Sequence, residues 1–365
     1  MAHLMTESPL PSRPRSRGRL ILQGAVSFAI VGGIFVGVMP SIASYSDVWA
    51  TIAAMTWLEV IALVIAGLIN LALYWWVMTA VLPGLTTAQA AVANQASTAV
   101  ANALPAGGAL GVGVSVAMYR SWGYSGASIV LATLVSGLWN TLVKLGLPVV
   151  ALVLLAATGH VGGGLIVAAA VGVAMLVAAI LVFGLMLRSP AVARRLGSRA
   201  ERMVNRGLGW LGRHPARGWG MAWERFSVST AILIRDRWVR ISLAAMVSHL
   251  SLFVVLLLAL RYVGVSEGDL PWIEVLAGFA FVRLLSALPI TPGGVGVVEL
   301  GYAAALGIGL DSLGKAEVVA AVLVFRFITY VLPIPLGAAS YVYWRRERRW
   351  RIGDSDHAIA SSDVP

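Results

Sequence analysis

The chain has 365 residues, of which 59% are hydrophobic and 12% are charged, and this composition excludes a water-soluble fold because soluble domains carry about 25% charged residues. Cysteine is absent and the five histidines are scattered, so we expect no disulfide, metal or cofactor. The net charge of +11 is concentrated beside apolar segments, not on a soluble surface, so nucleic-acid binding is not expected.

Six apolar segments are long enough to cross the membrane, since about 20 helical residues span about 30 Å of hydrocarbon. The first is too long for the apolar part of a signal peptide, so we predict an uncleaved span. In chain order, the predicted spans are Leu20–Met39, Trp57–Ala80, Ser128–Thr158, Leu165–Leu187, Ile241–Leu260 and Val318–Tyr343.

Arginines cluster in three segments, the tail before residue 20, Arg188–Arg240 and Arg345–Arg351, which the positive-inside rule places in the cytoplasm. We therefore predict a multi-pass plasma-membrane protein with both termini cytoplasmic. Ala191–Trp238 mixes arginines with apolar residues; it fits amphipathic helices on anionic lipid or a solvated loop that only fixes the topology. The predicted divisions are a basic tail (1–19), a first membrane half (20–187), a basic loop (188–240), a second membrane half (241–344) and a tail (345–365).

Two further apolar segments, 88–118 and 274–310, are each broken by proline and glycine. An even number of crossings in each half predicts that both are re-entrant helical hairpins, which enter from opposite sides of the membrane. The fold class is then an all-α integral membrane protein with six spans and two re-entrant broken helices. The alternative makes each segment a kinked span and splits Ser128–Thr158 into two helices at Pro148.

An internal repeat favours the hairpins. Ala103–Gly111 resembles Ala287–Gly296, and Gly146-Leu147-Pro148 resembles Val331-Leu332-Pro333 at a similar offset. The two copies would have opposite orientations, as in the inverted repeats of many transporters. Chance similarity between apolar segments rich in glycine and proline is the alternative.

The motif from Phe281 to Glu299, with Pro-Gly-Gly-Val-Gly at its centre, resembles the lysylphosphatidylglycerol synthase transmembrane-region family of flippase-like proteins. Arg326–Pro333 and Asn102–Gly108 resemble further elements of that family, so the likeness covers roughly residues 20–345. It implies movement of a lipid or lipid-linked headgroup between leaflets. The chain ends about twenty residues after the last span, so the soluble aminoacyl-transfer domain of the full synthases is not expected.

Charged residues within spans are functional candidates, because each costs at least about 2.5–3.5 kcal/mol at the bilayer centre. Lys144, Arg283 and Arg326 outnumber Glu299, which predicts an anionic ligand. We expect Arg283 and Arg326 to bind a phosphate headgroup. Glu299 either holds Arg283 when the site is empty or couples transport to protons. The alternative is that Arg283 and Glu299 form only a structural ion pair.

The second arm of each predicted hairpin begins at a glycine pair, where a helix N-terminus and an open backbone favour an anion. Asn140 precedes Lys144 by one helical turn and joins the candidates. The remaining candidate binding residues are Asn102, Pro105, Gly107, Gly108, Pro289, Pro292, Gly293, Gly294 and Gly296.

The leading hypothesis is a non-enzymatic, flippase-like transporter of an anionic membrane lipid. The chain has no P-loop, so ATP hydrolysis is not encoded in it. One alternative is a non-catalytic partner of an envelope lipid or glycosyl-transfer enzyme. The other is a membrane-embedded lipid-modifying enzyme. The 25 arginines against two lysines favour a bacterial source.

Overall fold

The computed structural model describes residues 36–37, 39–104, 107–157, 163–210, 218–286, 291–347 and 349–350. In these ranges the chain is helical and has no strand. The predicted span Leu20–Met39 lies almost entirely outside the described residues, as do Pro105 and Pro289.

Five helices in the described ranges are long and apolar enough to cross a membrane, and they match the other five predicted spans. The last of them is continuous over Ser312–Arg346 and includes a π-helical turn. They are α4 (Trp57–Val81), α7 (Gly126–Ala157), α8 (Gly163–Arg188), α11 (Trp238–Tyr262) and the run formed by α14 (Ser312–Arg326), η3 (Phe327–Val331) and α15 (Pro333–Arg346).

Proline affects two of these spans differently. Helix α7 continues through the buried Pro148, so the alternative that splits it into two helices there is wrong. Pro148 has no N–H, which leaves the carbonyl of Lys144 without its usual helical partner. Before Pro333 the chain instead forms a π-helical turn, closed by the N–H of Leu332 donating to the carbonyl of Phe327 at 2.9 Å. Such turns recur where a helix absorbs a proline and at functional sites.

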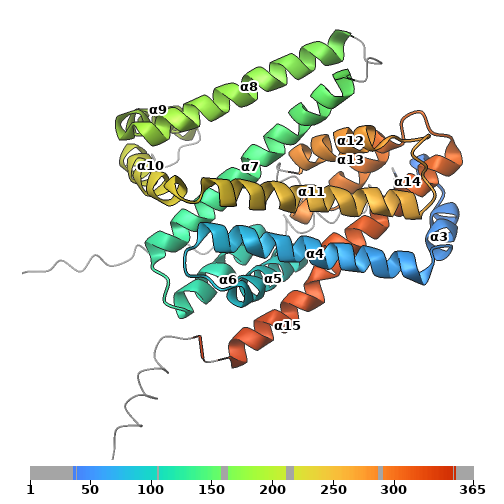
Figure 1. Cartoon of the computed structure of the whole chain (residues 1–365), viewed down its shortest axis with the longest axis horizontal. Helices are drawn as coiled ribbons and strands as arrows, with labels where there is room; N and C mark the ends of the chain where they lie inside the picture. The colour runs from blue at the N-terminus through green and yellow to red at the C-terminus, as the bar shows by residue number, and fades with distance from the viewer. Residues whose placement is uncertain are drawn as a thin grey trace, which may run out of the picture.

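Each predicted hairpin segment forms two antiparallel helices. In the first, α5 (Thr87–Ala103) packs on α6 (Gly107–Ser121), and in the second, α12 (Trp272–Leu285) packs on α13 (Val297–Leu306). The short turn η2 (Pro292–Gly294) precedes α13 and contacts both α5 and α6. The hairpins point in opposite directions along the bundle, so their tips meet inside it (Figure 1). Their re-entrant path through a membrane stays a prediction.

The packing partners of the two halves correspond. Helix α4 lies beside α11, and α5 packs along α15 in the same way that α12 packs along α7. The closest approach is at Gly337 of α15, where an added Cβ would lie 2.0 Å from the carbonyl oxygen of Gln95. These contacts are compatible with the predicted inverted repeat, which stays a prediction.

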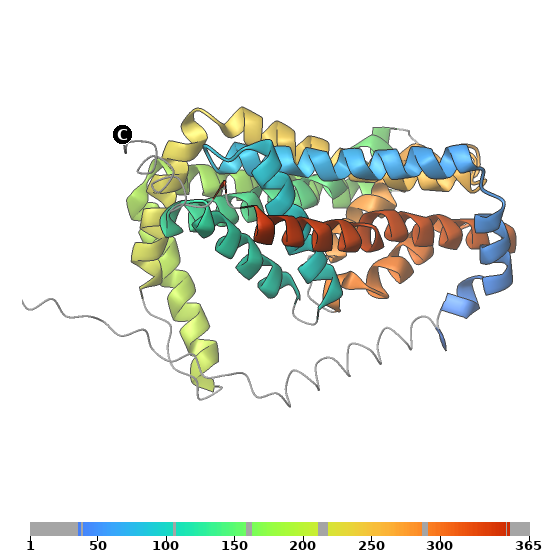
Figure 2. The same ribbon diagram turned by 90° about the horizontal axis from the view of Figure 1, so that it is seen from below.

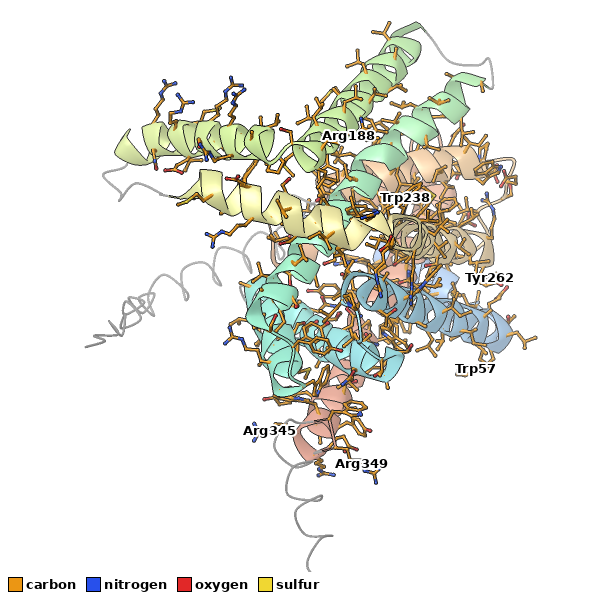
Figure 3. All side chains as sticks on the ribbon, turned by 60° about the vertical axis from the view of Figure 1, so that its left-hand side comes forward. Trp57, Arg188, Trp238, Tyr262, Arg345 and Arg349 are labelled. Carbon is orange, nitrogen blue, oxygen red and sulfur yellow. The ribbon has the colours of Figure 1, made fainter. Side chains whose placement is uncertain are left out.

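Charge separates the two ends of the bundle. Helices α9 (Pro190–Trp210) and α10 (Trp219–Arg235) lie at one end, and α2 (Met39–Ile42) and α3 (Tyr45–Ala53) lie at the other (Figures 1 and 2). The C-terminal end of α15 lies with the basic end, because Trp344 Nε1 donates to Ser121 Oγ at 3.1 Å. In Figure 3, Trp57 and Tyr262 are likewise far from Arg345 and Arg349. This polarity fits the positive-inside rule, although the side that faces the cytoplasm stays a prediction.

The basic loop is a pair of packed helices. Gly197 of α9 lies against Trp219 and Trp223 of α10, so close that an added Cβ would be 2.7–2.9 Å from their atoms. On another face of α9, four exposed arginines recur at helical spacing: Arg195, Arg199, Arg202 and Arg206. The prediction of helices in this loop agrees with the structure, and their contact with anionic lipid stays a prediction.

Candidate functional site

Glu299, the acid predicted to lie deepest in the membrane, already has hydrogen-bond and ion-pair partners in the protein. Glu299 is in the first turn of α13, where its Oε2 accepts a 2.7 Å hydrogen bond from the N–H of Gly296. Its Oε1 is 2.5 Å from Nε of Arg326 on α14. Their side chains are only 5% and 14% exposed, so this ion pair is largely shielded from solvent. The pair therefore fastens α13 to α14.

This geometry corrects the expected pairing, because Glu299 holds Arg326 and does not pair with Arg283. The reason is the return of the chain: α14 packs back along α13 and brings Arg326 to the capped end of α13. Arg326 also donates to the carbonyl oxygen of Gly293 at 3.2 Å, so it ties the glycine turn to the last span. The side chain of Arg326 therefore donates its hydrogen bonds to groups of the protein.

Arg283, in contrast to Arg326, forms no ion pair within the described residues. It lies in the last turn of α12, it is half-buried, and its Nε is fully buried without a hydrogen-bond partner. Its charge interacts with Arg326 and with the hydroxyls of Tyr302 and Tyr74, which come from α13 and α4. A buried donor without a partner is unfavourable, so Arg283 has an unmet capacity to bind an acceptor.

Lys144 extends this cationic region on the neighbouring span. It is half-buried on α7, which packs along α12, the helix that carries Arg283. Two like charges on neighbouring helices repel each other, and an anion bound between them would relieve this repulsion. Lys144 and Arg283 therefore lie on neighbouring helices, and neither takes part in the Glu299–Arg326 ion pair.

The tip of the first hairpin contacts the last span at Tyr330, next to Arg326. Asn102 Nδ2 donates to the carbonyl oxygen of Tyr330 at 2.9 Å, and Tyr330 Oη donates to the carbonyl oxygen of Asn102 at 2.8 Å. The guanidinium of Arg326 lies 4.3 Å from the centre of the Tyr330 ring, a cation–π contact. Tyr330, in the π-helical turn η3, therefore joins the two halves and was missed by sequence reasoning, although it lies inside the Arg326–Pro333 motif.

The glycines of the second hairpin are required by their backbone. Gly293, Gly294 and Gly296 have φ of 61°, 68° and 83°, which side chains disfavour. An added Cβ on Gly293 would lie 2.3 Å from the ring of Tyr330. The expected open N-terminus is absent at this hairpin, because α13 begins at Val297 and not at the glycine pair, and Glu299 already caps it. Pro292 is the first residue of the turn η2.

The two candidate glycines of the first hairpin differ. Gly107 is buried, and an added Cβ would be 2.3 Å from the carbonyl oxygen of Ala101, so it is required for packing between α5 and α6. Gly108 is exposed, with no atom within 4 Å of an added Cβ. Helix α6 begins at Gly107, as expected.

Asn140 lines a small cavity of about 10 Å³, room for about one water molecule. The cavity lies among α4, α7 and α11. His249 contributes an Nε2 that is buried without a partner, while its Nδ1 lies 3.0 Å from the carbonyl oxygen of Ala245. The residues that line the cavity are Tyr74, Val77, Ser136, Asn140, Ala245, Ser248 and His249.

Comparison with known proteins identifies one family. A family model described as "Lysylphosphatidylglycerol synthase TM region" matches residues 21–337, which is most of the chain. No curated protein sequence matches the chain. The matched range includes both hairpins, the Glu299–Arg326 pair and the cationic residues Lys144 and Arg283.

Proposed function

Because this chain belongs to the lysylphosphatidylglycerol synthase transmembrane-region family, we propose that it moves an anionic phospholipid or lipid-linked headgroup between the leaflets of the plasma membrane. The transport is flippase-like and involves no chemical change to the lipid. The observation that carries this proposal is the unpartnered buried Nε of Arg283, which faces no acid because Glu299 is bound to Arg326.

In this proposal, Arg283 and Lys144 form the headgroup site. The guanidinium of Arg283 is planar and can donate parallel hydrogen bonds to two oxygens of one phosphate. Lys144, on α7, supplies a second positive charge from the facing helix. A headgroup that enters between these helices exchanges hydration for these donors, while its acyl chains stay in the surrounding lipid.

The Glu299–Arg326 pair and Tyr330 have a different role, which is to hold the backbone around the site. Arg326 fixes the glycine turn through the carbonyl of Gly293, and Tyr330 fixes the tip of the first hairpin through Asn102. Movement of a headgroup past this point requires the two hairpin tips to separate, and these contacts set the free energy of that step.

The test is leaflet exchange in liposomes that contain the purified chain. Fluorescent phosphatidylglycerol and fluorescent phosphatidylcholine are reconstituted in parallel, and quenching of the outer leaflet reports exchange. We expect the protein to accelerate exchange of the anionic lipid at least tenfold more than that of the zwitterionic lipid. Arg283→Gln should remove this acceleration, whereas Lys315→Gln, the only other lysine position, should keep it.

Equal acceleration of both lipids would contradict an anion site. Exchange that appears only after a second membrane enzyme is added would favour the role of a non-catalytic partner. Chemical conversion of the labelled lipid, read by chromatography of the same samples, would favour a lipid-modifying enzyme.

A further inference from the structure

The candidate site residues inside the bundle carry more positive than negative charge. Lys144, Arg283 and Arg326 bring three positive charges, and Glu299 brings one negative charge that is bound to Arg326. In the described part of the chain, the side chains of Lys144 and Arg283 have no ion pair. Two positive charges are therefore left without compensation.

These two charges are placed to act on one guest. Arg283 is near the C-terminal end of α12, and Lys144 is in the middle of α7, along which α12 packs. Because the two side chains come from helices that pack against each other, an anion bound between these helices would interact with both. The groups whose charges act on Arg283 are Tyr302, Arg326 and Tyr74, and none of these three is an acid that forms an ion pair with it.

In a low-dielectric interior, an anion with one charge would leave one of these cations uncompensated. An anion with two charges would neutralise both. Arg283 can hold two oxygens of a phosphate through its fork, and Lys144 can approach a third oxygen as a point charge. The free charge of the site therefore matches a dianion better than a monoanion.

We propose that the headgroup bound between Lys144 and Arg283 is a dianion, a terminal phosphate monoester carried on a lipid, and that a phosphodiester is a weaker ligand. This deepens the proposed transport function and rests on it. The two kinds of headgroup differ in one ionisation, because a phosphate monoester loses its second proton near pH 6, whereas a diester has one charge at any pH near neutrality.

The test compares two lipids with the same short chains, dihexanoyl phosphatidic acid and dihexanoyl phosphatidylglycerol. Their binding to the full chain in nanodiscs of phosphatidylcholine is measured by calorimetry at pH 7.5 and pH 5.0. We expect the monoester to bind at least tenfold more tightly at pH 7.5. At pH 5.0 the monoester has lost its second charge, so the difference should shrink to about twofold. Equal affinities at pH 7.5 would overturn the proposal.

Charge variants locate the selectivity. Lys144→Gln removes one of the two free charges, so the preference for the monoester should fall to threefold or less while the diester still binds. Lys315→Gln removes the other lysine, which lies in the first turns of α14, and should keep the full preference. A preference that survives both Lys144→Gln and Arg283→Gln would show that other residues select the headgroup.

Two further outcomes separate this inference from the proposed function and from other phosphate sources. If both lipids bind equally and both are moved between leaflets, the selection of a dianion is wrong and the transport function stands. If neither lipid binds and neither is moved, the proposed function itself is wrong. Inorganic phosphate that binds as tightly as dihexanoyl phosphatidic acid would show a site for free phosphate and not for a lipid headgroup.

Discussion

The hairpins α5–α6 and α12–α13 have the same antiparallel design and opposite directions, yet they differ in charge. In the first, the only charged residue is the exposed Arg120 at the end of α6, and the contact between the helices is made by small residues such as Gly107. The second carries Glu274, Arg283 and Glu299 and has three glycines with positive φ at its turn. One hairpin is thus a neutral packing element, and the other contributes the ion pair and the free cation.

The two hairpins therefore share an architecture but have different roles. The neutral hairpin contacts the charged one at the turn η2, and its Asn102 bonds to Tyr330 of the following span through backbone carbonyls. The charged hairpin depends on Arg326, a residue of the following span, to neutralise Glu299. The four predictions below break or sharpen this comparison.

The largest expected effect concerns the side of the membrane that each end of the bundle faces, and it is all-or-none. Single cysteines at Ser229 on α10 and at Ser312 on α14 are exposed and lie at the two ends to which the hairpins open. Because the chain lacks native cysteine, an impermeant maleimide should label each from one side of the membrane only, and from opposite sides. Labelling of both from the same side would rule out the inverted arrangement.

The ion pair should be the next largest contribution to stability. Glu299→Gln leaves Arg326 charged and largely buried, so the free energy of unfolding in a denaturing-detergent titration should fall by about 3–5 kcal/mol. The double variant Glu299→Gln/Arg326→Gln should recover part of this loss. Arg120→Gln, in the neutral hairpin, is the matched control and should leave the transition unchanged. Additive losses in the double variant would mean that the two residues act independently.

The glycine turns should respond differently to the same substitution. Gly293→Ala places a side chain at φ 61° and against Tyr330, so we expect a loss of at least about 1–2 kcal/mol in the same titration and a loss of transport. Gly108→Ala, in the other hairpin, meets open space and should be neutral or slightly stabilising because alanine favours helix. A transport defect in Gly108→Ala with unchanged stability would instead place a guest beside the first hairpin.

The smallest effect should come from the tether between the hairpins. Tyr330→Phe removes the hydrogen bond to the carbonyl oxygen of Asn102 and should cost about 1 kcal/mol. It keeps the ring over which Arg326 lies, so the Glu299–Arg326 contribution should be unchanged. A loss as large as that of Glu299→Gln would mean that the hydroxyl supports the ion pair as well.

Much of the fold follows from patterns that a single sequence displays. Long apolar runs predict spans because the bilayer imposes a length, and five of the six predicted spans match helices with ends within a few residues, apart from the earlier start of the last. Breaks at proline and glycine predict both hairpins because their chemistry is local. The continuation of α7 through Pro148 shows the limit of such rules, since packing on both sides keeps that helix intact.

The candidate site was likewise predicted only in part from the sequence. Composition and position identified Lys144, Arg283, Glu299 and Arg326, because a charge in an apolar span is conspicuous in any sequence. The pairing of Glu299 with Arg326 and the isolation of Arg283 depend on which helix returns beside α13, and sequence spacing carries no information about that. Tyr330 was missed for the same reason, because only its contacts across the two halves distinguish it from other interfacial tyrosines.

The sequence by itself therefore determined that the protein lies in a membrane, five of its spans and the breaks in both hairpin segments, all of which are local or additive properties of the chain. Tertiary structure alone decided which acid neutralises which base, because an ion pair forms between side chains that packing brings within about 4 Å, whatever their separation in sequence. The two positive charges that are left over result from that choice. They are the physical basis for a ligand that brings two negative charges.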